Sequence, residues 1–122
     1  MRAPVIALLP LLLSPACDEQ RRRDCDALVA ATKPLEAREG SEKALPTLET
    51  VEGVKKQVES MKVSDHTLSI HVQNYVKTLG VLSSTVALKS SSSSPDGTDD
   101  VIRKNLKEAR SEANDVKRYC AE

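Results

Sequence analysis

The sequence predicts an all-α fold, a small up-down helical bundle in which four helices are favoured and three are possible. Apolar residues recur at helical spacing from Asp24 onward, and no segment of the 122-residue chain alternates apolar and polar residues as a strand does. Aromatic residues make up 2 % of the chain, which argues against a β-sandwich. Two cysteines, Cys25 and Cys120, stand near opposite ends of this helical region and can close it.

The first helix of the predicted bundle begins near Asp24, and Pro34 leaves its end undefined. Its apolar stripe has the 3-4-3 spacing of one helix face: Cys25, Leu28, Thr32 and Leu35. Gly40 and Ser41 indicate a break, as the C-terminal cap of this helix and the N-cap of the next.

The second helix is expected to begin near Leu45, because Pro46 is compatible only with a first helical turn. Its stripe consists of Leu45, Leu48, Val51, Val54, Val58 and Met61. In the three-helix alternative, the first two segments form one long helix bent at Pro34 and Pro46.

The third helix is expected from Asp65 to Lys89, with Ser64-Asp65 as its N-terminal cap. Its stripe consists of Leu68, Val72, Tyr75, Val76, Leu79, Leu82 and Val86. The Ser-rich segment 90–97 follows as a linker and turn, because its five consecutive serines have nothing apolar to bury.

The last helix starts at Thr98 and carries a heptad stripe typical of a coiled-coil-like contact. This stripe consists of Ile102, Leu106, Ala109, Ala113, Val116 and Cys120. Cys25 and Cys120 each continue the stripe of their helix, so we expect them to form a disulfide. Such a bond places the start of the first helix beside the end of the last, which an up-down bundle allows only with an even number of helices.

The N-terminus has the pattern of an export signal. A single basic residue, Arg2, precedes a short apolar run that is about half as long as a membrane-spanning helix, and small residues follow it. The segment Leu13-Ser14-Pro15-Ala16-Cys17 resembles the lipobox of bacterial lipoproteins. This resemblance implies cleavage before Cys17, which then carries a diacylglyceryl thioether and an N-acyl chain such as palmitate.

The resemblance ends at Cys17 and leaves an alternative open. Ser14 occupies a position where lipoproteins have an aliphatic residue, and Ser14 with Ala16 also fits the ordinary signal peptidase, which would release a soluble protein. The cysteine count favours lipidation, because a modified Cys17 leaves Cys25 and Cys120 as an even pair in an oxidising compartment.

The chain therefore divides into three parts: a signal peptide (1–16), a lipid-anchored tether (17–23) and a single helical domain (24–122). The tether contains three consecutive arginines, Arg21-Arg22-Arg23, among acidic residues. We expect a solvated segment here, and contact with anionic lipid head groups is the alternative.

Composition and residue spacing indicate no catalytic, metal or cofactor site. The formal net charge is +0 and aromatic residues are scarce, so nucleic-acid binding is not expected. His66 and His71 lie five residues apart on different faces of the third helix, and the cysteines lack the short spacing of a zinc site. No pattern indicates a small-molecule substrate.

These observations predict a non-enzymatic lipoprotein of a bacterial cell envelope that acts as a binding or structural module. Its expected partners are a membrane, contacted through the lipid on Cys17, and a protein of unknown identity. Asp18 resembles the residue that retains enterobacterial lipoproteins at the inner membrane, but the sequence does not decide between inner and outer membrane. The alternative is a secreted or periplasmic helical binder or inhibitor.

Overall fold

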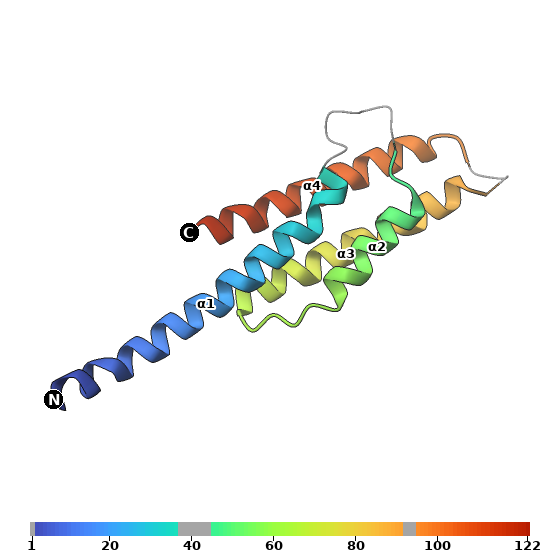
Figure 1. Cartoon of the computed structure of the whole chain (residues 1–122). Helices are drawn as coiled ribbons and strands as arrows, with labels where there is room; N and C mark the ends of the chain where they lie inside the picture. Colours follow the sequence, from blue (N-terminus) through green and yellow to red (C-terminus); the bar gives the residue numbers. More distant parts are fainter. Residues whose placement is uncertain (1, 37–44, 92–94) are drawn as a thin grey trace.

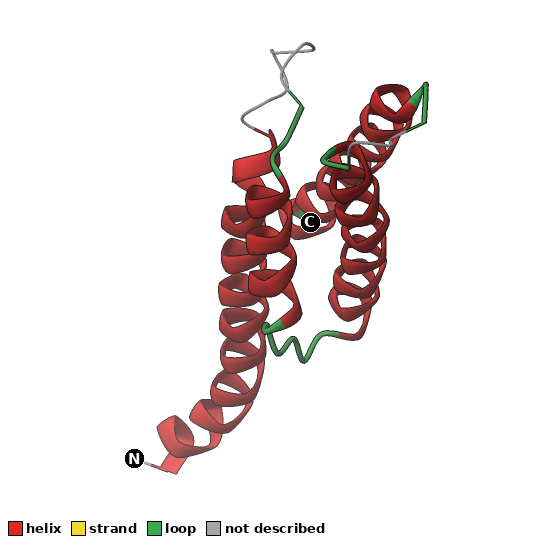
Figure 2. Cartoon of the chain, turned by 90° about the vertical axis from the view of Figure 1, so that its right-hand side faces the viewer, coloured by secondary structure: helices red, strands yellow, loops and turns green. Residues whose placement is uncertain are grey.

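Four helices form the part of the chain that the computed structural model describes, residues 2–36, 45–91 and 95–122. They are α1 (Arg2–Glu36), α2 (Leu48–Glu59), α3 (His66–Lys89) and α4 (Thr98–Ala121), and these ranges contain no strand. Successive helices run antiparallel (Figures 1 and 2), and each packs against two others, α1 and α3 both contacting α2 and α4. The predicted all-α up-down bundle is confirmed, with four helices.

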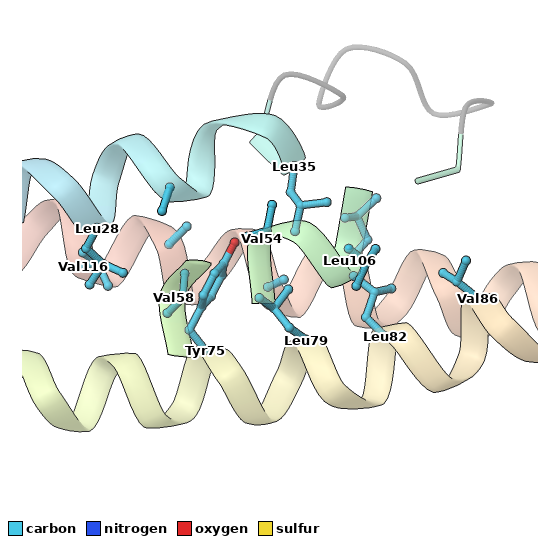
Figure 3. Close-up of a cluster of buried hydrophobic side chains, with 14 of the residues drawn as sticks. Leu28, Leu35, Val54, Val58, Tyr75, Leu79, Leu82, Val86, Leu106 and Val116 are labelled. Atoms are coloured by element: carbon cyan, nitrogen blue, oxygen red, sulfur yellow. The ribbon is translucent and has the colours of Figure 1, made fainter. Parts of the chain in front are cut away.

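The stripes predicted from the sequence form one continuous core, part of which is drawn in Figure 3. Cys25, Leu28, Thr32 and Leu35 of α1 are all buried. The most extensive helix pair is α3 with α4, where Ala109 and Ala113 are buried and their small side chains permit close approach. The remaining buried apolar residues of α2, α3 and α4 are Val51, Val54, Val58, Leu68, Tyr75, Leu79, Leu82, Val86, Ile102, Leu106 and Val116.

The beginnings of α2 and α3 are fixed by side-chain caps. Thr47 accepts a hydrogen bond from the backbone N–H of Thr50 at 3.2 Å, and the predicted cap Asp65 accepts one from Leu68 at 2.9 Å. The predicted start of α2 near Leu45 is wrong, because Thr47 is extended and Leu48 is the first helical residue. Pro46 therefore precedes the helix instead of occupying its first turn.

Helix α1 is much longer than the predicted first helix. It runs without interruption from Arg2 to Glu36, so residues 17–23 are helical, and its N-terminal half projects beyond the other helices (Figure 1). Pro34 lies within the last turn of α1. The break predicted at Gly40 and Ser41 lies outside the described residues.

The start of α4 is fixed by a compact turn. Gly97 has a φ of +87°, a backbone conformation that glycine adopts without strain, and the Thr98 hydroxyl donates to the Pro95 carbonyl at 2.6 Å. Lys89 at the end of α3 pairs with Asp99 at 2.9 Å. Of the predicted linker 90–97, residues 92–94 lie outside the described part of the chain.

The expected disulfide joins Cys25 of α1 to Cys120 of α4, with 5.7 Å between their Cα atoms. The two residues are 95 positions apart in the sequence. The three-helix alternative would have put them at opposite ends of the bundle, and the structure excludes it.

Removing this bond by the double substitution Cys25→Ser and Cys120→Ser should lower the free energy of unfolding by about 4–5 kcal/mol. The bond closes a long loop in the unfolded chain, so its removal increases the conformational entropy of the unfolded state. Urea denaturation of the exported protein measures the change. The double variant should be insensitive to a reductant that destabilises the parent protein, and equal stability of the two proteins would contradict the prediction.

Candidate functional site

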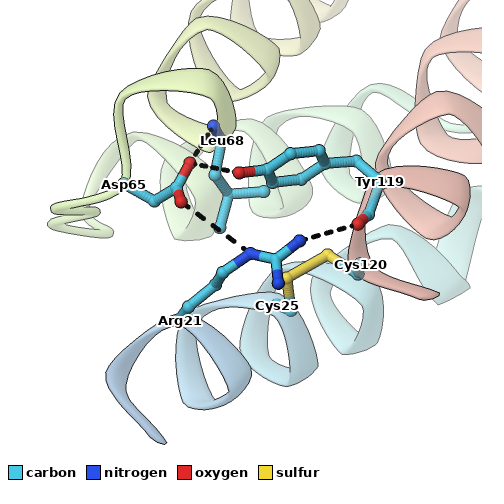
Figure 4. Close-up of a disulfide and its surroundings, with 6 residues drawn as sticks. All are labelled: Arg21, Cys25, Asp65, Leu68, Tyr119 and Cys120. Carbon is cyan, nitrogen blue, oxygen red and sulfur yellow. Dashed lines mark hydrogen bonds and ion pairs between the residues drawn. A yellow bond between two sulfur atoms is a disulfide. The ribbon is translucent and has the colours of Figure 1, made fainter. Parts of the chain in front are cut away.

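Three helix segments meet at the disulfide end of the bundle, which is the candidate site. Here α1 passes into the bundle, α3 begins and α4 ends, and their side chains converge (Figure 4). Arg21 and Cys25 come from α1, Tyr119 and Cys120 from α4, and Asp65 caps α3. Residues distant in the sequence are therefore held together at the point where the predicted lipid-bearing segment adjoins the folded domain.

Asp65 links all three of these segments. Its Oδ1 accepts hydrogen bonds from the Leu68 N–H and from the Tyr119 hydroxyl at 2.7 Å, while the Arg21 Nε lies 3.8 Å from Oδ2. The backbone hydrogen bond from Leu68, the hydroxyl of Tyr119 and the positive charge of Arg21 together lower the pKa of the Asp65 carboxyl from its ordinary value of 3.8. Asp65 thus connects the start of α3 to α1 and α4 as a carboxylate.

Arg21 makes a second set of contacts with the last turn of α4. Its guanidinium donates to the backbone carbonyl of Tyr119 at 3.0 Å and lies over the Tyr119 ring, 4.6 Å from the centroid. That carbonyl, which also accepts from the backbone N–H of Glu122 at 3.3 Å, belongs to the helix end, where the helix dipole favours a cation. The expectation of a solvated segment is wrong for Arg21.

The sequence contains a signal that Arg21 lies on the side of α1 that faces the bundle. Arg21 precedes Cys25 by four positions, so it extends the α1 stripe by one turn and lies on the face turned to the other helices. Arg22 and Arg23 are exposed, and the Arg23–Glu19 pair at 3.5 Å is a surface contact of small energetic value. The run of three arginines does not by itself show which of them contacts the other helices.

An open groove of about 710 Å³ lies next to the disulfide, between α1 and the C-terminal end of α4. Its lining mixes both charge signs with small apolar side chains. The lining residues are Asp18, Arg21, Arg22, Cys25, Asp26, Val29, Ala30, Lys33, Cys120, Ala121 and Glu122. The opposing charges give this groove no preference for an anion or a cation.

Cys17 lies in α1, eight residues before Cys25, and its side chain is outside the described part of the chain. At about 1.5 Å per residue, its backbone is only ~12 Å along the helix from the disulfide. Arg21, one turn after Cys17, already contacts α3 and α4. The position proposed for lipidation is therefore separated from the bundle by one turn of helix.

The two histidines do not form a shared site. His66 is exposed, whereas His71 is half-buried with its ring 5.7 Å from that of Tyr119. Among the described residues, no three His, Cys, Asp or Glu side chains are grouped so that they could hold a metal ion. Ser90 bonds back to the Val86 carbonyl at the end of α3, and Ser92–Ser94 of the serine run lie outside the described residues.

Two further carboxylates, Glu36 of α1 and Glu112 of α4, are partly buried. Glu36 of α1 pairs with Lys117 at 2.7 Å. Burial raises the pKa of Glu112, against the opposing effect of a hydrogen bond with the Thr78 side chain on α3. Glu36 thus joins α1 to α4 and Glu112 joins α4 to α3, and the charges of both add to the burial that raises the pKa of the Tyr75 hydroxyl.

Comparison with known proteins leaves the function to be argued from the chain itself, because no protein-family model, curated protein or solved structure matches it. In the part of the chain that the structure describes, no helix combines the length and the apolar character needed to span a membrane.

Replacing Asp65 with Asn should destabilise the protein at neutral pH and have a smaller effect in acid. The folded state lowers the Asp65 pKa, so its stabilising contribution is fully present above the unfolded value near 3.8 and is lost as the pH falls through the lowered folded value. Urea denaturation of both proteins across the acidic range measures the difference in unfolding free energy.

The matched control is Asp96→Asn in the exposed turn before α4, which should show no such pH-dependent difference. A destabilisation by Asp65→Asn that stays constant from neutral pH to below the ordinary pKa of aspartate would show that the charge of Asp65 does not stabilise the disulfide end.

Proposed function

We propose that this chain is a lipoprotein of a bacterial cell envelope, attached to a membrane through acyl chains on Cys17, and that it acts as a non-catalytic binding or structural module. The pairing of the cysteines carries this proposal. Cys25 and Cys120 are bonded to each other, so Cys17 is the one remaining cysteine of the three in the sequence. It stands at the lipobox-like segment, where a thiol is the acceptor of the lipid.

The geometry of the disulfide end supports a fixed orientation at the membrane. Arg21 is held by Asp65 and Tyr119, one helical turn after Cys17. A lipid on Cys17 would therefore place the disulfide end near the membrane surface and direct the opposite end of the bundle away from it. The turn at Pro95–Gly97 lies at that opposite end and would be accessible to a protein partner (Figure 1).

The polar contacts of the disulfide end support a structural role for this part of the protein. The polar side chains that meet there, Arg21, Asp65 and Tyr119, are engaged with one another and with helix ends. Their contacts stabilise the junction of three helices.

A second candidate function is a secreted or periplasmic helical binder or inhibitor that carries no lipid. The specific observation in its favour is the pair of small residues Ser14 and Ala16, which suits the ordinary signal peptidase. The two candidates differ in the mature N-terminus and in the modification of Cys17, so one experiment distinguishes them.

The test is metabolic labelling with a palmitate analogue in a bacterium that expresses the chain with its own leader. The wild-type protein should incorporate the label and partition into detergent, because two or three acyl chains bind a bilayer stably. Cys17→Ala should lose both properties, since it removes the sulfur that carries the diacylglyceryl group.

The control is the double variant Cys25→Ser and Cys120→Ser, which keeps Cys17 and should still be labelled. Intact mass of the mature protein gives a second readout. An unlabelled wild-type protein in the aqueous phase, with a mature N-terminus that carries no added mass, would contradict lipidation and favour the secreted alternative.

A further inference from the structure

The peptide bond between Ala16 and Cys17 is cut in both candidate functions, and it lies inside a helix. The lipobox-like segment places cleavage before Cys17, and the small residues Ser14 and Ala16 direct the ordinary signal peptidase to the same bond. Helix α1 runs without a break from Arg2 to Glu36, so this bond is near its middle. Cleavage therefore has to open a continuous helix.

A helical bond is a poor substrate for a peptidase. Peptidases bind the chain in an extended form, through backbone N–H and C=O groups that a helix uses for its own hydrogen bonds. Cleavage of a folded protein therefore proceeds through a locally opened form, and its rate follows the population of that form. On the C-terminal side of the bond, the residues that must leave the helix begin with 17–20, of which Asp18, Glu19 and Gln20 are exposed.

Arg21 determines how far this opening extends. Its guanidinium donates to the Tyr119 carbonyl at 3.0 Å, lies over the Tyr119 ring and is 3.8 Å from the Asp65 carboxylate (Figure 4). The next residues of α1 held in the bundle are Asp24 and Cys25, which are 8 % and 5 % exposed. While the Arg21 contacts persist, only residues 17–20 are free to unwind, and when these contacts are lost, residues 17–23 are free.

The two free segments differ in their reach. Four extended residues span about 14 Å, and seven span about 24 Å. Two packed helices are about 20 Å wide, so the end of the bundle obstructs a peptidase whose cleft is deeper than the shorter span. The contacts of Arg21 therefore shorten the accessible segment to less than the width of the bundle.

The partners that close the disulfide end come late in the chain. Tyr119 follows Arg21 by 98 residues, and Cys120 follows Cys25 by 95. Export begins at the signal peptide, so residues 17–20 reach the envelope before the residues that close the disulfide end. During that interval the bond is accessible and Arg21 has not yet met its partners.

We propose, on the basis of the cleavage that both candidate functions share, that closure of the disulfide end regulates removal of the signal peptide. The Ala16–Cys17 bond is hydrolysed while this end is open, and the contacts of Arg21 with Asp65 and Tyr119 then make any remaining precursor a poor substrate. One water molecule is consumed in the cut, and it supplies the hydroxyl of the new Ala16 carboxyl group and a proton of the new Cys17 amino group. This order holds with or without a lipid on Cys17.

The test is a pulse-chase measurement of the full chain in a bacterium whose signal peptidases can be inhibited reversibly. One sample is labelled without inhibitor, and the other is held as precursor until its disulfide has formed, as shown by thiol alkylation, and is then released. The held wild-type precursor should be cleaved at least about tenfold more slowly, because a hydrogen bond with a charged group contributes at least about a factor of ten to the closed population. Arg21→Ala should bring the two rates to within about threefold.

Two variants separate reach from charge. Arg23→Ala removes the same charge at a side chain that is 73 % exposed, and it should behave as the wild type does. Insertion of Gly-Ser-Gly-Ser between Gln20 and Arg21 keeps the contacts of Arg21 but doubles the length of the free segment. The held precursor of this insertion variant should be cleaved within about threefold of the nascent rate, although its disulfide end is folded.

Three results overturn the proposal. A held wild-type precursor that is cleaved as fast as the nascent chain shows that closure does not protect the bond. Equal acceleration by Arg21→Ala and Arg23→Ala assigns the effect to charge, and slow cleavage of the insertion variant shows that reach is not the cause.

Failure of the proposed function is read separately, from the palmitate label. A wild-type protein that lacks the label but shows the expected cleavage rates contradicts lipidation alone. A labelled protein whose held precursor is cleaved rapidly contradicts only the role of Arg21, and a chain that is never cut between Ala16 and Cys17 contradicts both.

Discussion

The Cys25–Cys120 disulfide is the constraint from which the arrangement of the bundle follows. It fixes the entry of α1 beside the end of α4 across 95 positions of sequence, with 5.7 Å between the Cα atoms. An up-down bundle meets this condition only with an even number of helices, and the stripes supply four. The core is built largely from Val, Leu and Ala, with Tyr75 as its one aromatic residue. A covalent link that restricts the unfolded chain adds stability that so small a core does not provide by itself.

Arg21, Asp65 and Tyr119 extend the effect of the disulfide from two helices to three. The disulfide joins α1 to α4, and Asp65 adds the start of α3 by capping it while accepting from Tyr119. Arg21 contacts both of these residues, so the orientation of α1 is defined up to one turn after Cys17. If Cys17 carries a lipid, the bundle stands on the membrane by a short helical connection, and its surfaces face fixed directions.

Helices α3 and α4 differ in the chemical character of their outer faces. Helix α4 pairs a buried apolar stripe with an outer face rich in charged residues, whereas α3 has apolar residues on both its core face and its outer face.

The sequence by itself determined the helical class, the buried stripes, the Asp65 cap and the disulfide pair, because apolar periodicity, capping side chains and cysteine count are local or countable features. It placed the start of α2 too early, since Pro46 permits a first-turn position but Thr47 supplies the cap. Only the tertiary structure decided between three and four helices and gave Arg21 its partners on α3 and α4. Those features depend on which helices become neighbours, and spacing within one helix carries no information about the charges on the next.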